Sequence, residues 1–170
     1  MKHENLFKLV LTALFAALAC VATMVIHIPI PATNGYINLG DGAVLLGAFV
    51  LGPFYGAAAG GLGSMLADLL LGYASYAPGT LLIKGLMAFC AAGVFTAFRK
   101  RTGAAFAGAL TGEIVMILGY FAYESTLLGY GLAAAASIPG NGIQGAAGLI
   151  VSLAAYKALT AIPSVKKLCY

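Results

Sequence analysis

Residues 80–101 read TLLIKGLMAFCAAGVFTAFRKR, and this stretch decides the class of fold. The hydrocarbon core of a bilayer is about 30 Å thick, so a helix that rises about 1.5 Å per residue needs about 20 apolar residues to cross it. The run Thr80–Phe98 meets that requirement with one charge, Lys84, inside it. Three basic residues, Arg99–Arg101, follow at once, which is typical of the cytoplasmic end of a span.

The whole chain has the composition of a membrane protein. Of its 170 residues, 62% are hydrophobic and 8% are charged, and the mean hydropathy is +0.99. A soluble domain carries about 25% charged residues. The 23 glycines favour close helix packing in a bilayer. The low charge excludes a soluble domain, and the length favours a single membrane domain over residues 1–170.

Outward from this stretch, apolar runs predict an all-α integral membrane protein, a bundle of six membrane-spanning helices. Their approximate ranges are 5–27, 42–52, 54–72, 80–98, 103–124 and 142–162. The second run is too short to cross the bilayer straight, and the stretch before it, 28–41, is polar and broken by proline. Irregular backbone at membrane depth is tolerated only where protein buries it or where it lines a cavity. We therefore expect 28–41 to form a lid loop over a cavity.

Basic residues predict the orientation of the bundle. Eight of the nine lie near the N-terminus, between the fourth and fifth spans, or near the C-terminus: Lys2, Lys8, Arg99, Lys100, Arg101, Lys157, Lys166 and Lys167. By the positive-inside rule both termini are cytoplasmic, which requires an even number of spans. The net charge of +4 therefore reflects topology, and we expect no nucleic-acid partner. The first apolar run continues to Ile26, so we expect it to be retained and not removed as a signal peptide.

Polar residues of the predicted spans gather in the outer half of the membrane or near its midplane. They are Asp41, Ser64, Asp68, Lys84, Glu113, Tyr120, Glu124, Asn141 and Gln144. A charge at this depth costs about 2.5–3.5 kcal/mol on insertion scales, so such residues usually have a partner or a function. Glu113, Tyr120 and Glu124 share one stripe of the fifth span. The pattern predicts a pocket that opens to the outside, and the excess of acid disfavours a strongly anionic ligand.

Some of these residues also have a structural interpretation. Asp41 follows Gly40 and is typical of a helix N-cap. Asn141, with Gln144 three residues later, resembles a capping box for the sixth span. Whether these side chains cap helices or bind a ligand stays open at this point.

Lys84 and Asp68 form a candidate structural ion pair, with Ser64 on the same helix stripe as Asp68. Glu113 is the hardest to explain structurally, because its own helix carries no cation. The sequence contains no HExxH, GxxxxGK[ST] or GxSxG motif, and its three cysteines lack metal-binding spacing. We therefore expect no metal, no cofactor and no nucleotide hydrolysis by this chain.

Five short motifs carry a resemblance to a known family. They are GYINLGD at 35–41, LGP at 51–53, GGLGSMLAD at 60–68, GYASYAP at 72–78 and IKG at 83–85. With them the chain resembles the substrate-binding S components of energy-coupling factor (ECF) vitamin transporters. The likeness in size and layout covers essentially the whole chain, and the specific motifs lie between residues 35 and 85.

The resemblance implies a multi-pass protein of the bacterial plasma membrane that captures a vitamin or precursor at the outer face and catalyses no reaction. The loop between its first two helices would cap the ligand. A transmembrane coupling subunit and two cytoplasmic ATPases would then complete the importer. Members dock on the coupling subunit through small residues at four-residue spacing on the first helix, and Ala13 and Ala17 match that pattern.

Within the family the chain resembles the members that handle hydroxymethylpyrimidine, pyridoxine or riboflavin, and it lacks the tryptophan of thiamine and biotin members. The predicted substrate-binding residues are Tyr36, Asn38, Asp41, Lys84, Glu113, Tyr120, Asn141 and Gln144. We expect Glu113 to accept a hydrogen bond from an amine or hydroxymethyl group of the ligand. We expect Tyr36 or Tyr120 to stack on its ring.

Two other functions are alternatives. A stand-alone secondary transporter could use the carboxylates to carry protons, but such proteins often show inverted repeats of broken helices, and none is convincing here. A membrane-embedded enzyme could use Glu113 and Lys84, but it would need a nucleophile or a metal set beside them, and none is apparent.

Overall fold

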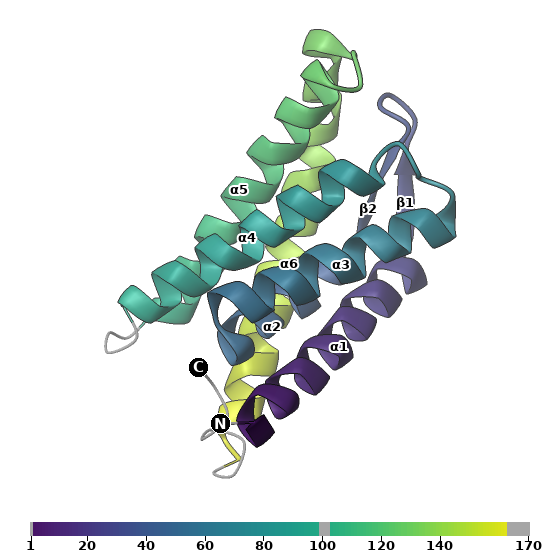
Figure 1. Cartoon of the computed structure of the whole chain (residues 1–170). Helices are drawn as coiled ribbons and strands as arrows, with labels where there is room; N and C mark the ends of the chain where they lie inside the picture. Colours follow the sequence, from purple (N-terminus) through teal and green to yellow (C-terminus); the bar gives the residue numbers. More distant parts are fainter. Residues whose placement is uncertain (1, 99–102, 163–170) are drawn as a thin grey trace.

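A computed structural model describes residues 2–98 and 103–162, with side chains from Asn5 onward. Most of the basic residues used for the orientation lie outside the described residues or side chains: Lys2, Arg99, Lys100, Arg101, Lys166 and Lys167. The described chain is a bundle of six α-helices with one small hairpin (Figure 1). This confirms the predicted all-α membrane bundle, apart from the hairpin.

The helices follow the apolar runs of the sequence. They are α1 Lys2–Val25, α2 Gly40–Leu51, α3 Pro53–Leu71, α4 Ala77–Ala97, α5 Ala104–Thr126 and α6 Ile138–Thr160, and a 3-10 helix, η1 Gly131–Ser137, leads into α6. Five segments of the described chain are long and apolar enough to cross a membrane, and α2 is not. α1 begins and α6 ends at one end of the bundle, away from the hairpin (Figure 1).

The predicted irregular lid loop is in fact an antiparallel β-hairpin, with β1 at His27–Ile30 and β2 at Gly35–Asn38. The four residues 31–34 form its turn. The last of them, Asn34, has a positive φ of 52°, a conformation that asparagine tolerates better than most residues. Pro29 fits because β1 is an edge strand and needs no donor on its free side. The prediction of irregular backbone was wrong here, because two strands of only four residues each, joined by a four-residue loop, give a weak pattern in the sequence.

α2 is the centre of the bundle. All of its 12 residues are buried, and it packs against α1, α3, α4 and α6. At about 1.5 Å per residue it is about 18 Å long, so it cannot cross the hydrocarbon core alone. It ends at Gly52, whose φ of 81° suits glycine, and Pro53 starts α3 at once. The hairpin therefore occupies the part of the bundle that α2 leaves unfilled.

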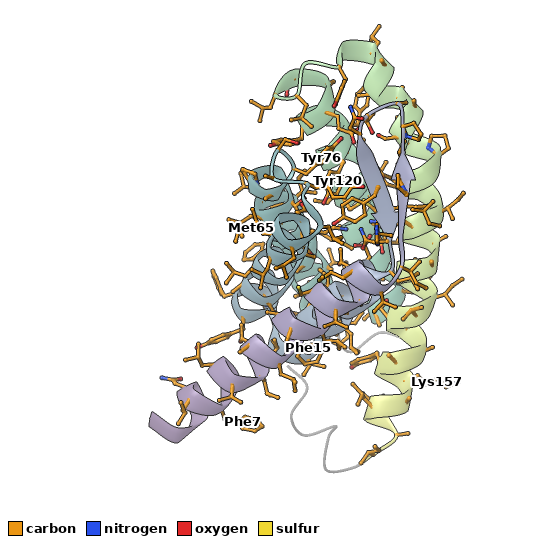
Figure 2. All side chains as sticks on the ribbon, turned by 90° about the vertical axis from the view of Figure 1, so that its right-hand side faces the viewer. Phe7, Phe15, Met65, Tyr76, Tyr120 and Lys157 are labelled. Atoms are coloured by element: carbon orange, nitrogen blue, oxygen red, sulfur yellow. The ribbon has the colours of Figure 1, made fainter. Side chains whose placement is uncertain are left out.

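Glycines let α3 approach α2 closely. A Cβ on Gly56 would lie 2.7 Å from Ala48 Cα, and a Cβ on Gly60 would lie 2.7 Å from Val44 Cγ1. The same stripe of α3 continues into Ser64 and Asp68, which are buried and polar. The packing seam thus becomes polar toward the hairpin. Figure 2 shows Tyr76 and Tyr120 at that end of the molecule and Phe7 and Lys157 toward the other.

Candidate functional site

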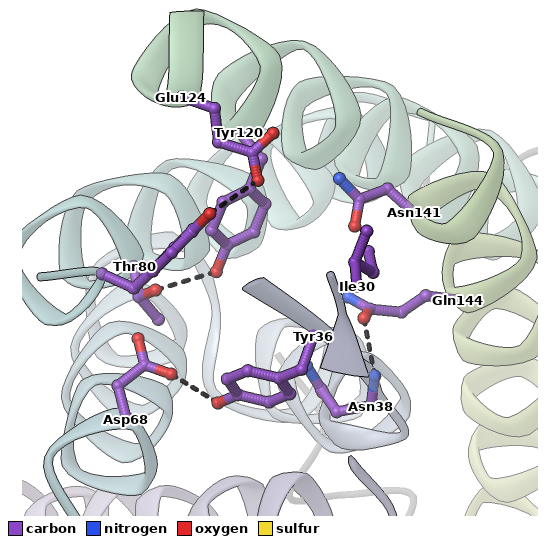
Figure 3. Close-up of a pocket in the computed structure, with 10 residues that line it drawn as sticks. Ile30, Tyr36, Asn38, Asp68, Thr80, Tyr120, Glu124, Asn141 and Gln144 are labelled. Carbon is purple, nitrogen blue, oxygen red and sulfur yellow. Dashed lines mark hydrogen bonds between the residues drawn. The ribbon is translucent and has the colours of Figure 1, made fainter. Parts of the chain in front are cut away.

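A polar cavity lies beneath the hairpin, between α3, α4, α5 and α6 (Figure 3). Its lining residues are Ile30, Tyr36, Asn38, Asp68, Tyr76, Thr80, Tyr120, Glu124, Asn141 and Gln144. The cavity has a volume of about 20 Å³, which is room for about one water molecule. The hairpin therefore closes over the cavity in this structure.

The α3 side of the cavity is formed by Asp68, which is 2% exposed. The Tyr36 hydroxyl, from β2, donates a hydrogen bond to Asp68 Oδ1. Asp68 Oδ2 and the nearby buried Ser64 hydroxyl have no hydrogen-bond partner among the described residues. Thr80 lies beside Asp68 on the cavity wall, and its hydroxyl lies 3.0 Å from the Tyr120 hydroxyl, where either group can donate. One oxygen of this buried carboxylate is therefore available.

Glu124 holds the turn of the hairpin in place from the end of α5. The Tyr76 hydroxyl lies 3.1 Å from Glu124 Oε1 and 2.7 Å from the Thr33 carbonyl oxygen in the hairpin turn. The Ser137 hydroxyl donates to Glu124 Oε2 at 2.5 Å. We call Thr33, Tyr76, Glu124 and Ser137 the hairpin latch. Both oxygens of Glu124 are engaged in it, so Glu124 differs from Asp68.

The α6 side of the cavity is formed by amides. Gln144 Oε1 accepts the Asn38 backbone N–H at 2.7 Å, so it ties β2 to α6. Asn141 is 5% exposed and makes no side-chain hydrogen bond to a described residue. The predicted capping box is wrong, because α6 begins at Ile138 and Asn141 lies inside its first turn. The Asn141 amide is therefore free to contact a ligand.

Asp41 and Lys84, which do not line the cavity, form a network with the wall residue Gln144, and we call these three residues the floor triad. Lys84 Nζ forms an ion pair with Asp41 Oδ1, and Gln144 Nε2 donates to Asp41 Oδ2 at 2.7 Å. Lys84 is therefore paired with Asp41, and the predicted pair with Asp68 is wrong. The predicted N-cap role of Asp41 is also wrong, since Asp41 lies in the first turn of α2 and Leu39 is the cap residue. Lys84 Nζ also lies 5.5 Å from the centre of the Tyr120 ring.

Glu113 lies deeper than the cavity. It is 4% exposed, and neither carboxylate oxygen has a hydrogen-bond partner among the described residues. It packs against Gly148, where an added Cβ would lie 2.5 Å from Glu113 Oε1 and 2.7 Å from Asp41 Cβ. Its other neighbours border an apolar hollow of about 330 Å³ between α5 and α6, formed by residues such as Ile114, Ile117 and Leu149.

Five of the predicted binding residues lie together on the cavity wall: Tyr36, Asn38, Tyr120, Asn141 and Gln144. The structure does not bring Asp41, Lys84 or Glu113 to that wall. Five wall residues were not among the predicted binding residues: Ile30, Asp68, Tyr76, Thr80 and Glu124. Asp68 was predicted as a structural ion-pair residue instead. The sequence did indicate that Glu124 could lie at the site, because it shares a helix stripe with the predicted binding residue Tyr120. There was no such indication for Thr80 and Tyr76 beyond their place at the start of α4.

The electrostatics of the wall favour a ligand without negative charge. The two charged side chains on it are the carboxylates of Asp68 and Glu124, and no lysine or arginine of the described residues lines it. Burial, and then the neighbouring Asp68, raise the pKa of Tyr36. Burial and Glu124 likewise raise the pKa of Tyr76. Both hydroxyls therefore stay protonated and donate. Among the described residues, no group of three or more His, Cys, Asp and Glu could hold a metal ion.

Comparison with known proteins identifies the family. The model of the family described as "ECF-type riboflavin transporter, S component" matches residues 4–161. A Pyrococcus woesei protein, "Uncharacterized protein in gap 3'region", is 41% identical over 131 residues, which are 77% of this chain and 86% of that protein. The "Thiamine precursor transporter HmpT" of Lactococcus lactis subsp. cremoris (strain MG1363) is 30% identical over 136 residues, 79% of this chain and 77% of that protein.

A solved structure has the same fold. It is described as "Structure and mechanism of the S component of a bacterial ECF transporter", and it aligns with a TM-score of 0.69 at 23% identity over 92% of this chain and 97% of that one. The resemblance that the motifs between residues 35 and 85 indicated is therefore confirmed. The chain belongs to the ECF-type riboflavin transporter S component family and is the substrate-capture subunit of an ECF importer.

Proposed function

We propose that this S component captures a small, uncharged or cationic heterocyclic vitamin or vitamin precursor in the cavity beneath the hairpin. The observation that carries the proposal is the cavity wall, which combines hydroxyls, amides and two carboxylates with aromatic rings. Such a wall offers hydrogen bonds to a heterocycle and repels a strongly anionic ligand. The family description names riboflavin, and one relative is named for a thiamine precursor. The candidates are hydroxymethylpyrimidine, pyridoxine and riboflavin.

The hairpin acts as the lid in this proposal. A cavity of about 20 Å³ is too small for a heterocyclic ring, so the ligand enters only when the hairpin moves away. Its hydrogen bonds to the rest of the chain are Tyr36 to Asp68, Asn34 to Tyr130 at 3.3 Å, the Asn38 N–H to Gln144, the Thr23 hydroxyl to Asn38 Oδ1 at 3.5 Å, and the latch. β1 is largely exposed. In this proposal the hairpin opens by releasing these contacts while the helices stay packed.

We place the cavity on the outer side of the plasma membrane, with both termini in the cytoplasm. Two described basic residues outside the bundle core support this. Lys157 lies toward the end of the molecule opposite the hairpin (Figure 2), and Lys8 lies near the start of α1, which begins at that same end (Figure 1). The positive-inside rule assigns that end to the cytoplasm. The lid then faces the medium from which the vitamin is taken up.

The partners in this proposal are a transmembrane coupling subunit and two ATPases. Ala13 and Ala17 lie on the exposed face of α1, next to Leu14 and Leu18, which are 61% and 47% exposed. Small residues at this spacing allow another helix to approach closely. Replacing both alanines by leucine should leave ligand binding intact and abolish uptake with the partner subunits. Ala122→Leu, on the exposed face of α5, is the matched control and should leave uptake unchanged.

The test of the function is ligand identification. The protein is purified in detergent, the co-purified compound is identified by mass spectrometry, and its binding is titrated by calorimetry. We expect tight one-to-one binding without chemical change of the compound. Uptake into liposomes by this chain alone would favour a secondary transporter, and chemical conversion of the compound would favour a membrane enzyme. Either result would contradict the proposal.

A further inference from the structure

We infer that Asp68 selects the ligand: its free Oδ2 accepts a hydrogen bond from an amine on one edge of a planar heterocycle, while the opposite edge meets the Asn141 amide. This inference rests on the proposed function and narrows its substrate class. The sequence predicted Glu113 as the carboxylate that binds the ligand; this inference assigns that role to Asp68 on α3 instead.

The first observation is the unequal state of the buried carboxylates. Asp41 uses both oxygens, one for Lys84 and one for Gln144. Glu124 uses both oxygens in the hairpin latch. Asp68 binds the Tyr36 hydroxyl through Oδ1, and its buried Oδ2 has no partner among the described residues. Of the two carboxylates on the cavity wall, only Asp68 thus has an oxygen without a hydrogen-bond donor among the described residues. A buried acceptor without a donor is costly, which favours a donor arriving with the ligand.

The second observation is the free amide on the other side of the cavity. Figure 3 shows Asp68 and Asn141 on opposite sides of the cavity, with Tyr120 on the wall between them. Gln144 Oε1 accepts a hydrogen bond from the Asn38 N–H, and Gln144 Nε2 donates one to Asp41. Asn141, in contrast, makes no side-chain hydrogen bond to a described residue. An amide presents both a donor and an acceptor. Two unsatisfied groups thus face each other across a space bordered by aromatic rings, which suits a flat ligand with polar edges.

The chemistry of these groups narrows the class of ligand. A carboxylate acceptor needs a donor, and an exocyclic amine on a pyrimidine ring supplies one. The edge of a flavin ring presents its N–H between two carbonyl oxygens, which would lie against the carboxylate of Asp68 and be repelled. A phosphate ester would meet Asp68 and Glu124 with no lysine or arginine of the described residues on the wall. The wall therefore favours an aminopyrimidine-type precursor over riboflavin or a phosphorylated compound.

The experiment is a two-by-two titration by calorimetry in detergent. The ligands are 4-amino-5-hydroxymethyl-2-methylpyrimidine and the same compound without the amine; the proteins are wild type and Asp68→Asn. We expect wild type to prefer the amine by about 10- to 100-fold, as for a hydrogen bond to a charged acceptor. We expect Asp68→Asn to lower that preference to less than about threefold. Glu113→Gln, a matched change of carboxyl to amide outside the wall, should keep the wild-type preference.

The outcomes separate this inference from the proposed function. A preference for the amine that persists in Asp68→Asn overturns the inference, and so does wild-type protein that binds riboflavin but not the aminopyrimidine. In both cases the proposed function stands. Binding of none of the candidate vitamins overturns the proposed function and this inference together. If Asp68→Asn does not fold, the wild-type protein decides: a preference for the amine below about threefold overturns the inference.

Discussion

Two polar clusters lie one above the other in this apolar bundle, and they differ in how far their hydrogen bonds are satisfied. In the floor triad, both oxygens of Asp41 are engaged by Lys84 and Gln144. On the cavity wall above it, Asp68 Oδ2 and the Asn141 amide have no hydrogen-bond partner among the described residues. Both clusters are buried and charged, so burial and charge do not separate them. Their hydrogen bonding does: Asp41 of the floor triad is satisfied within the fold, whereas in our proposal the free groups of the wall are satisfied by a ligand.

The largest expected effect comes from breaking the floor triad. Lys84→Met leaves Asp41 as a buried charge with no cation, and such a change costs about 3–5 kcal/mol. We expect a large drop in the thermal unfolding midpoint in detergent. The double variant Asp41→Leu with Lys84→Met removes both charges and should recover part of the loss. If the double variant is as unstable as the sum of its single variants, the pair does not act as a unit.

A smaller effect should come from the packing beneath the cavity. Gly148→Ala places a Cβ 2.5 Å from Glu113 Oε1 and 2.7 Å from Asp41 Cβ, and overpacking of this kind typically costs about 1–3 kcal/mol. Gly142→Ala is the matched control, because a Cβ there meets nothing within 4 Å. It should be neutral or slightly stabilising, since alanine favours a helix over glycine. Equal unfolding midpoints for the two variants would show that α6 does not pack closely on Glu113 and Asp41.

The smallest effect on stability, with a clear effect on kinetics, is expected at the hairpin latch. Tyr76→Phe removes the hydroxyl that bridges the Thr33 carbonyl and Glu124. Because a hydrogen bond contributes about 0.5–1.5 kcal/mol net, the ligand should dissociate about 2- to 10-fold faster in stopped-flow measurements. Tyr123→Phe loses a bond to the Ser75 carbonyl oxygen, outside the latch, and should leave the rate unchanged. Equal rates for wild type and Tyr76→Phe would remove the latch from the account of lid opening.

The bundle itself could be predicted from the sequence because apolar length and charge placement are local properties. The hairpin was not predicted, because each of its strands has only four residues and the loop between them, 31–34, is not a two-residue turn. Pro29 and Pro31 in the stretch 28–41 also indicated a loop, because proline is unfavourable inside most strands. An edge strand tolerates Pro29, but which strand lies at an edge is decided only by the fold.

The site could be predicted only in part, because helix periodicity shows which face a residue is on but not its depth. Glu113 and Tyr120 share a stripe of α5, yet seven residues separate them by about 10 Å along the axis. That distance places Tyr120 on the cavity wall and Glu113 below it. The partner of Lys84 was likewise beyond local rules, because both Asp41 and Asp68 lie at a suitable depth. The central position of α2 brings Asp41 to Lys84.

The central claim is that the cavity opens to the outside when the hairpin lifts and closes on a ligand. It is tested most directly by thiol labelling of Thr80→Cys, on the cavity wall, in a background with Cys20, Cys90 and Cys169 replaced. Ser152→Cys, buried on α6 outside the cavity wall, is the control. A membrane-impermeant reagent applied outside intact cells should label Thr80→Cys, saturating ligand should block that labelling, and Ser152→Cys should stay unlabelled. Labelling of Thr80→Cys from the cytoplasmic side alone, or labelling that ligand does not affect, would contradict the account.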